Sequence, residues 1–234
     1  DLPNRLRPPS FKHWLGTDDY GRDIFSRVVI GARITLLVGF GCVAVAFWLS
    51  LIIGLIAGYF GGRVDSVITR AIDIWMAFPW FVLAVAIAAV IGPGIVNAML
   101  ATGLAIVPSF ARLIRASVMS VKEKDFILAA RALGMSESRI ILRHILNNIT
   151  APVIVVSTLR IATSILNASS LSFLGLGVQP PTAEWGAMLG EGRVFLVSAP
   201  HVVFFPGIMI LITVLAVNLW GDALRVVLDP KLRV

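Results

Sequence analysis

Charged side chains are scarce in this sequence: 14% of its 234 residues are Asp, Glu, Lys or Arg, whereas 58% are hydrophobic. The mean hydropathy is +0.91. A water-soluble domain of this length cannot bury so much apolar surface. Several apolar runs exceed about 18 residues, the length that crosses a bilayer as a helix. The composition therefore excludes a soluble domain and predicts an all-α, polytopic membrane protein.

Cysteine and histidine are nearly absent. The single cysteine, Cys42, lies in an apolar run, and His13, His144 and His201 are far apart in the sequence. A disulfide within the chain is excluded, and no Cys/His cluster indicates a metal site. We therefore expect this chain to bind neither a metal nor a cofactor of its own.

Motifs for nucleotide binding and for hydrolysis are missing as well. The sequence has no Gly-x-x-x-x-Gly-Lys-Ser/Thr phosphate loop, so it offers ATP no site of that kind. It also has no Gly-x-Ser-x-Gly, no His-Glu-x-x-His and no pair of intramembrane aspartates. These absences disfavour an intramembrane enzyme.

Apolar spans make up most of the chain after a polar, turn-rich segment at 1–33. We expect the transmembrane domain to cover 34–224 and a short tail to cover 225–234. Prolines within the spans are expected to kink their helices. The predicted spans lie at 34–60, 66–91, 95–119, 150–174 and 201–222.

Basic residues indicate which connections face the cytosol. The connection from Arg112 to His144 carries seven basic residues against three acidic ones, and the 61–70 connection and the tail are basic too. Cytoplasmic loops are enriched in Lys and Arg, so all three are expected in the cytosol. This distribution accounts for the net charge of +7 without a basic stripe, and nucleic acid is not an expected partner.

The remaining connections are poor in basic residues and are expected outside. The 92–94 and 175–200 connections carry one basic residue between them. Alternation of the spans then places 1–33 outside, although that segment holds six basic residues, diluted by four acidic ones. A further span upstream is expected to bring the chain across the membrane, which would give six spans in all.

A polar, helix-prone stretch at 120–148 interrupts the apolar chain. Gly134 suits the position after a helix end, where a positive φ costs nothing, and Ser136 can cap a helix that starts at Glu137. The pattern leaves two interpretations open, a helix that docks on a cytosolic partner and a helix that lies on the membrane surface. Helical spacing places one set of apolar residues on a common face: Phe126, Ala129, Ala130 and Leu133.

The segment 16–23 contains a second polar motif. The density of Gly and Asp at 16–23 favours a tight extracytoplasmic turn, with Asp23 near the start of a helix whose dipole favours a negative charge there. The acids lack the spacing of a calcium loop. The residues of this motif are Gly16, Thr17, Asp18, Gly21, Arg22 and Asp23.

Arg160 is the only full charge well inside a predicted span. It lies roughly 16 Å from the start of that span at 1.5 Å per residue. A charge at this depth is costly against lipid, so it should face the bundle interior or a water-filled path. Two interpretations remain open: a residue of a transport pathway, or a structural partner of Asp73 or of backbone carbonyls.

The stretch 125–139 resembles the Glu-Ala-Ala loop of ATP-binding-cassette (ABC) importer permeases, through which a cytosolic ATPase moves the membrane domain. Ala129, Ala130 and Gly134 stand at the spacing of that motif, whereas Leu128 replaces its usual Glu. The resemblance implies that coupling to the ATPase involves Asp125, Phe126, Leu128, Ala129, Ala130, Leu133, Gly134 and Ser136.

Two more segments narrow the resemblance, which covers essentially the whole chain. The runs 13–23 and 171–181 resemble the C-type permease subunit of dipeptide, oligopeptide and nickel importers. In that family an acid commonly precedes the second run, where this sequence has Asn167. Together with the depth of Arg160, this comparison gives three candidate pathway residues: Arg160, Asn167 and Ser170.

The resemblance implies the type I ABC importer fold and half of a translocation pathway for di-/oligopeptides or related small solutes. It also implies a homologous B-type permease, two ATP-binding subunits or domains that bind the ATP, and an extracytoplasmic binding protein. The expected location is the plasma (inner) membrane of a bacterium or archaeon. The alternative is a secondary transporter or channel that ATP does not drive. It predicts ionisable residues along the spans and internal repeats, and the sequence has few of the former and no visible repeat.

The predicted topology can be tested with single cysteines in a Cys42→Ala background. Cysteines at Ser10 and Thr182 should react with a membrane-impermeant thiol reagent added to intact cells, whereas a cysteine at Ser136 should react only after the membrane is opened. Labelling of residue 136 from outside would contradict the assignment of the 120–148 loop to the cytosol.

Overall fold

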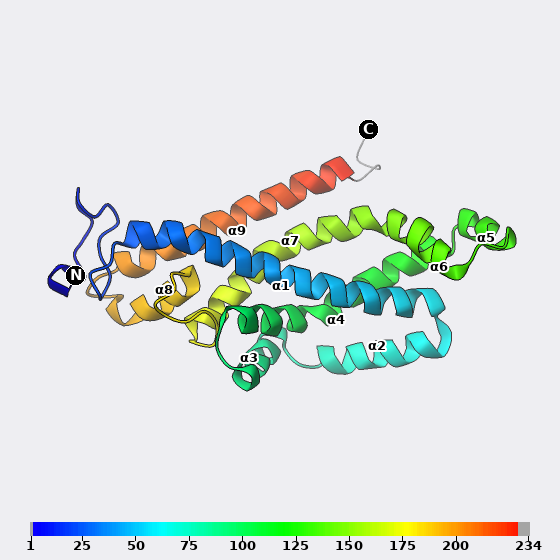
Figure 1. The fold of residues 1–234 in the computed structure, drawn as a ribbon, viewed down its shortest axis with the longest axis horizontal. Coiled ribbons are helices and arrows are strands. Elements are labelled where there is room, and N and C mark those ends of the chain that lie inside the picture. The colour runs from blue at the N-terminus through cyan, green and yellow to red at the C-terminus, as the bar shows by residue number, and fades with distance from the viewer. Residues whose placement is uncertain (1, 229–234) are drawn as a thin grey trace.

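The computed structural model describes residues 2–228 and contains no strand within that range. Long helices run side by side along the long axis of the molecule (Figure 1). In chain order the elements are η1 (Leu2–Asn4), α1 (Ile24–Phe60), α2 (Gly62–Met76), α3 (Trp80–Ile91), α4 (Ile95–Lys122), α5 (Asp125–Ala132), α6 (Glu137–Arg139), the π-helix η2 (Ile140–Ile145), α7 (Leu146–Phe173), α8 (Trp185–Gly192), η3 (Arg193–Phe195) and α9 (His201–Leu228).

Four helical stretches in the described residues are long and apolar enough to cross a membrane alone. They contain the predicted spans 34–60, 95–119 and 201–222 and nearly all of 150–174. Of the tail predicted at 225–234, residues 225–228 continue α9, and 229–234 lie outside the described part. The four stretches are Ile24–Phe60, Ile95–Lys122, Glu137–Phe173 and His201–Val227.

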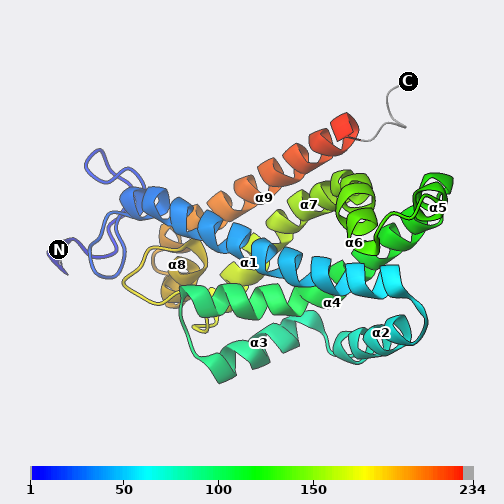
Figure 2. The same ribbon diagram turned by 45° about the vertical axis from the view of Figure 1, so that its right-hand side comes forward.

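The span predicted at 66–91 is a broken helix. Helices α2 and α3 meet at an angle of 87° and pass as a span only when taken together. Figure 2 shows the change of direction between them. Pro79 stands at the start of α3, where its ring disfavours helical geometry at Phe78. The kink expected at this proline is therefore a full interruption, whereas Pro108 and Pro206 lie inside continuous helices.

Asp23 starts α1, as its position in the sequence predicts. Its carboxylate accepts a hydrogen bond from the backbone N–H of Ser26 at 2.8 Å, which satisfies one of the unpaired amides of the first turn. The helix then runs without a break to Phe60. The prediction that a helix starts near Asp23 is confirmed, and this helix leads directly into the span predicted at 34–60.

Small residues bring α1 and α4 into close contact. An added Cβ at Gly54 would lie 2.8 Å from the side chain of Ile114, and one at Gly58 would lie 2.8 Å from the carbonyl oxygen of Arg115. Glycines four residues apart form such a close seam between membrane helices because lipid-facing helices gain little from hydrophobic burial. The packing therefore depends on backbone proximity.

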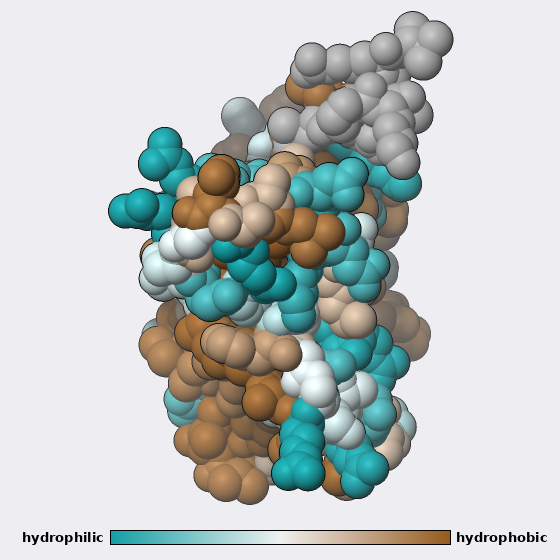
Figure 3. Space-filling model, turned by 90° about the vertical axis from the view of Figure 1, so that its right-hand side faces the viewer, coloured by the Kyte–Doolittle hydropathy of each residue, from teal (hydrophilic) through white to brown (hydrophobic). Residues whose placement is uncertain are grey.

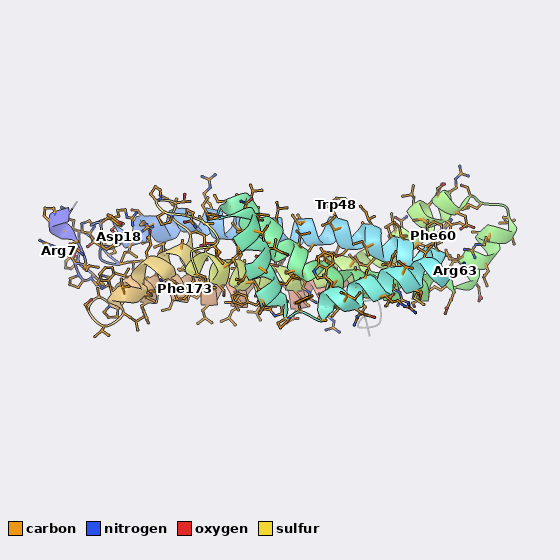
Figure 4. All side chains as sticks on the ribbon, turned by 90° about the horizontal axis from the view of Figure 1, so that it is seen from below. Arg7, Asp18, Trp48, Phe60, Arg63 and Phe173 are labelled. Atoms are coloured by element: carbon orange, nitrogen blue, oxygen red, sulfur yellow. The ribbon has the colours of Figure 1, made fainter. Side chains whose placement is uncertain are left out.

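The basic connections and the connections that are poor in basic residues lie at opposite ends of the molecule. Arg7 and Asp18 lie at one end, Phe60 and Arg63 at the other, and Trp48 lies between them (Figure 4). The 92–94 and 175–200 connections also touch, because the N–H of Gly94 donates to the carbonyl of Gly177 at 2.9 Å. The grouping follows the predicted alternation, and the compartment that each end faces stays a prediction.

The close seam predicts that Gly54→Ala is destabilising. The added methyl group would overpack the contact with α4, at a cost of about 1–3 kcal/mol. The thermal unfolding midpoint of the detergent-solubilised protein should fall. Gly207→Ala is the matched control, because the nearest atom to an added Cβ there is 3.8 Å away. Equal midpoints for the two variants would contradict the seam.

Candidate functional site

Helix α5 projects at the end of the molecule opposite to the N-terminal segment (Figures 1 and 2). Gly134 ends it with φ +75°. The N–H of Gly134 donates to the carbonyl of Arg131 at 3.0 Å, and the N–H of Met135 donates to that of Ala130 at 3.1 Å. These two hydrogen bonds form the Schellman motif, which needs a residue with a left-handed backbone conformation at this position. The predicted role of Gly134 as the end of the helix is confirmed.

One side of α5 packs against its own chain. Ile127 is 0% exposed and Ala130 is 7% exposed, and both belong to a core cluster with Ile140 and Ile145. Helical spacing grouped Ala130 with Phe126, Ala129 and Leu133, but its side chain faces the bundle whereas theirs are exposed. Ala130 follows Ile127 by three residues, so the two share a helix face, and Ile127 directs that face toward η2.

The opposite side of α5 is exposed and apolar. We define the coupling face as Phe126, Ala129 and Leu133, all exposed, with Leu133 at 86%. Asp125 and Leu128 are exposed beside it. Figure 3 looks onto this end and shows apolar and polar side chains interleaved on its surface. An apolar side chain left almost fully in solvent marks a surface that a partner can cover.

A cluster of polar side chains joins the end of α1 to the last turn of α5 and the first residue of α6. The hydroxyl of Tyr59, a residue that is 3% exposed, donates to the carboxylate of Glu137. Arg131 donates to the same hydroxyl at 3.3 Å and pairs with Glu137 at 3.4 Å. Ser136 stands before the first residue of α6 but makes no capping hydrogen bond with its side chain. The predicted Ser136 cap is therefore wrong, although the helix begins at Glu137 as predicted.

The predicted turn at the other end is built around a buried aspartate. Asp18 is 2% exposed, and its carboxylate accepts hydrogen bonds from the backbone N–H groups of Tyr20 at 2.9 Å and Arg22 at 2.8 Å. The backbones of Thr17 and Asp23 pair across the turn as an isolated antiparallel β-bridge. Glycines with positive φ permit the reversals at 16 and 21.

The same carboxylate joins this turn to α8. Asp18 lies 2.6 Å from both the Arg22 and the Arg27 guanidinium groups. These two arginines lie 3.3 and 2.9 Å from Glu191 on α8. We call Asp18, Arg22, Arg27 and Glu191 the Asp18 network. The sequence pattern contained the first two as motif residues, but it gave no signal for a pairing with Glu191.

Neighbouring aspartates of this turn have opposite pKa shifts. Burial opposes ionisation of Asp18, but the backbone N–H of Arg22 and the guanidinium groups of Arg22 and Arg27 outweigh it and lower the pKa of Asp18. Burial and the nearby carboxylates of Asp18 and Glu191 raise the pKa of Asp19. Ionised Asp18 therefore stabilises the turn, whereas ionised Asp19 does not.

Helix α8 is seated between α1 and α7 by a second buried carboxylate. Glu184 accepts hydrogen bonds from the hydroxyls of Thr35 at 3.2 Å and Ser169 at 3.1 Å. It also caps α8 through backbone N–H groups at 2.8 and 3.0 Å. The indole of Trp185 donates to the carbonyl of Val28 at 2.9 Å. The connection at 175–200 is thus locked onto both helices.

Two of the three candidate pathway residues share a cavity. Arg160 and Asn167 line a cavity of about 470 Å³, and Ser170 lines a separate one of about 230 Å³. Asp73 pairs with Arg112 at 2.5 Å, so the interpretation of Arg160 as its partner is wrong. Within residues 2–228, Arg160 forms no ion pair.

These features can be compared with known proteins. A family model described as "Binding-protein-dependent transport system inner membrane component" matches residues 50–234. The chain belongs to this family. It is a multi-pass permease of the ABC importer class, and the predicted family is confirmed.

Curated relatives match nearly the whole chain. A dipeptide transport system permease of Alkalihalophilus pseudofirmus is 52% identical over 230 residues, which cover 98% of this chain and 76% of the relative. A glutathione transport system permease of Escherichia coli is 49% identical over 233 residues, covering 100% of this chain and 77% of the relative. The alternative of a secondary transporter or channel is not favoured.

Solved structures agree on the fold. An inward-facing MetNI methionine ABC transporter matches with a TM-score of 0.72 at 17% identity, covering 88% of this chain and 98% of that one. An amino acid ABC transporter matches with a TM-score of 0.65 at 14% identity, covering 86% and 94%. The predicted type I importer transmembrane fold is confirmed.

The Asp18 network predicts a pH-dependent contribution to stability. Asp18→Asn should cost about 1–3 kcal/mol at pH 7, because the guanidinium of Arg27 loses a charged acceptor. A carboxyl group whose pKa is lowered on folding stabilises the folded protein, and this contribution is fully present at pH values above the pKa of the unfolded chain, near 3.8. The contribution is lost as the pH falls through the lower pKa of the folded protein. The unfolding midpoint of the variant should therefore vary less between about pH 5 and pH 2 than that of the unmodified protein.

Asp19→Asn is the matched control for that measurement. Its raised pKa means that the ionised form is disfavoured in the folded protein, so removing the charge should leave the midpoint at pH 7 unchanged or raise it. Equal losses for the two variants would show that any amide at this turn is harmful, and the network would then not carry the effect.

Proposed function

We propose that this chain forms half of the translocation pathway of an ATP-driven importer for di-/oligopeptides or related small solutes such as glutathione. The single observation that carries this is near 50% identity over the full chain to permeases named for dipeptide and glutathione transport. A homologous B-type permease would supply the other half. An extracytoplasmic binding protein would deliver the cargo, and two ATP-binding subunits or domains would supply the energy.

The geometry of α5 supports a coupling role. The coupling face is exposed and apolar, whereas Ile127 and Ala130 anchor the same helix to the bundle. A push on α5 would reach α1 through the Tyr59 hydroxyl and would reach α7 through Glu137 and the continuous helix η2. Packed helices transmit such displacements because close-packed cores deform little.

The charge distribution supports an ATP-driven mechanism over an ion-coupled one. Arg160 is a single unpaired charge midway along α7, whereas a proton or sodium path would use a series of ionisable groups. The pairs Asp73–Arg112 and Asp65–Arg115 hold the next charges, on α2 and α4. Energy is therefore expected to enter from α5.

Leu133→Asp tests this function. A charge on the coupling face would be buried without a partner when an ATPase docks, and such burial costs several kcal/mol. Peptide import per ATP hydrolysed should fall by about tenfold or more in proteoliposomes that contain the whole complex. Ala130 is unsuitable for this test because it is buried, and its substitution would also disturb the bundle.

Val64→Asp is the control, because Val64 is an exposed apolar residue at the same end of the molecule but on α2. It should leave import per ATP unchanged. Unimpaired import by an intact Leu133→Asp complex would contradict the coupling role. Peptide import by a complex that lacks any ATPase would overturn the proposed function as a whole.

A further inference from the structure

The cavity near the middle of the bundle combines aromatic walls with a small polar group of side chains. It lies where the break between α2 and α3 faces α4 and α7, and its volume of about 470 Å³ falls within the roughly 300–1,000 Å³ of small-molecule pockets. Its polar lining includes Ser109 on α4 and three residues of α7. Its aromatic lining comprises Trp75, Phe78 and Trp80.

The polar residues of α7 share one helix face. Arg160, Thr163 and Asn167 follow each other at helical spacing and all line the cavity. The hydroxyl of Thr163 donates to the carbonyl of Arg160 at 3.0 Å, and that of Ser109 donates to the carbonyl of Ile106 at 3.0 Å. Their oxygens remain able to accept, and the side chain of Asn167 makes no hydrogen bond within residues 2–228.

Arg160 lacks a counter-charge in this setting. It lies midway along α7, and its guanidinium forms no ion pair or hydrogen bond within the described residues. Both carboxylates of α2 are already paired, Asp73 with Arg112 and Asp65 with Arg115. A charge at this depth in a membrane protein is costly and is retained where a partner or a path uses it. A group that pairs with Arg160 in this cavity would carry a negative charge.

The break between α2 and α3 adds a partial positive charge to the lining of the cavity. Pro79, Trp80 and Leu83, from the first turn of α3, also line the cavity. The first N–H groups of a helix have no partner within it, and they give this end a partial positive charge. Broken helices in transporters turn such ends toward anionic groups. The guanidinium and this helix end therefore favour the same sign of ligand charge.

We propose that this cavity is a cargo subsite that binds a carboxylate through Arg160 while the aromatic wall holds the adjacent apolar part of the cargo. The chemical class is a small zwitterion or peptide with a free carboxylate, and the assignment rests on the proposed import function. Arginine suits this ligand because its planar donors match the two oxygens of a carboxylate. Asn167 adds an uncharged donor and acceptor for the neighbouring amide of the cargo.

The test measures how the charge of the cavity changes the reaction rate of a thiol placed in it. Thr163→Cys in a Cys42→Ala background gives one thiol in the cavity, and the assembled complex is reconstituted in proteoliposomes. The rate of modification is measured with an anionic and a cationic methanethiosulfonate of similar size. With Arg160 present the anionic reagent should be favoured, and Arg160→Gln should lower the ratio of the two rates by about fivefold or more. Arg160→Lys should keep most of it.

A ligand arm separates a carboxylate subsite from a merely basic cavity. A dipeptide with a free carboxylate should slow modification of Thr163→Cys, whereas the same dipeptide with a C-terminal amide should not, and Arg160→Gln should abolish the difference. A cysteine at Ser10, an exposed residue near the N-terminus, is the matched control. Its rate ratio should not depend on residue 160.

Three results would overturn the subsite: a rate ratio that is independent of residue 160, equal protection by the acid and the amide, or no modification of the cavity thiol by either reagent in an ATPase-active complex. Modification needs no import. A charge-dependent ratio with acid-selective protection but without import would therefore retain the subsite and contradict the proposed function. Normal import with a charge-independent ratio would do the reverse.

Discussion

In the hydrocarbon core of a bilayer there is no water to satisfy a charge or a backbone amide, and the rest of this structure depends on that constraint. Charged groups gather at the two ends of the molecule, in the Asp18 network and around Tyr59. Between the ends, helices approach through glycine, as at Gly54 and Gly58. Away from these ends, Asp73 and Arg112 pair with each other, whereas Arg160 lies unpaired on a cavity.

Helix α1 connects the two polar ends. It carries Arg27 of the Asp18 network near its start and Tyr59 near its end, and its 37 residues make a rod of about 55 Å at 1.5 Å per residue. Its close seam with α4 and its hydrogen bonds to α8 leave little freedom for independent bending. A displacement at α5 is therefore expected to move this helix as one body, and with it the turn at the opposite end.

Local signals made part of the structure predictable from the sequence. Asp23 as the start of α1 and Gly134 as the end of α5 follow from preferences of single residues over one helical turn, and both are found. The burial of Ala130 and the partners of Asp73 and Glu137 were missed or wrong. They depend on contacts between residues far apart in sequence, such as Tyr59 and Glu137, which no periodic pattern encodes. The depth of the break at Pro79 also escaped prediction, because membrane helices often accommodate proline with a mere kink.

The break between α2 and α3 has a consequence for the energetics of passage. The first amides of α3 have no partner within the helix, and hydrocarbon supplies none, so the interruption has to be solvated. The neighbouring cavity opens at the surface of the chain, where Phe78, Pro79, Trp80 and Thr163 are exposed, so water or a polar ligand can reach these amides there. The main barrier for a zwitterion that crosses a membrane is the removal of its hydration shell. A solute bound there would exchange part of its hydration shell for the fixed dipoles of the helix end and the charge of Arg160, which would lower that barrier.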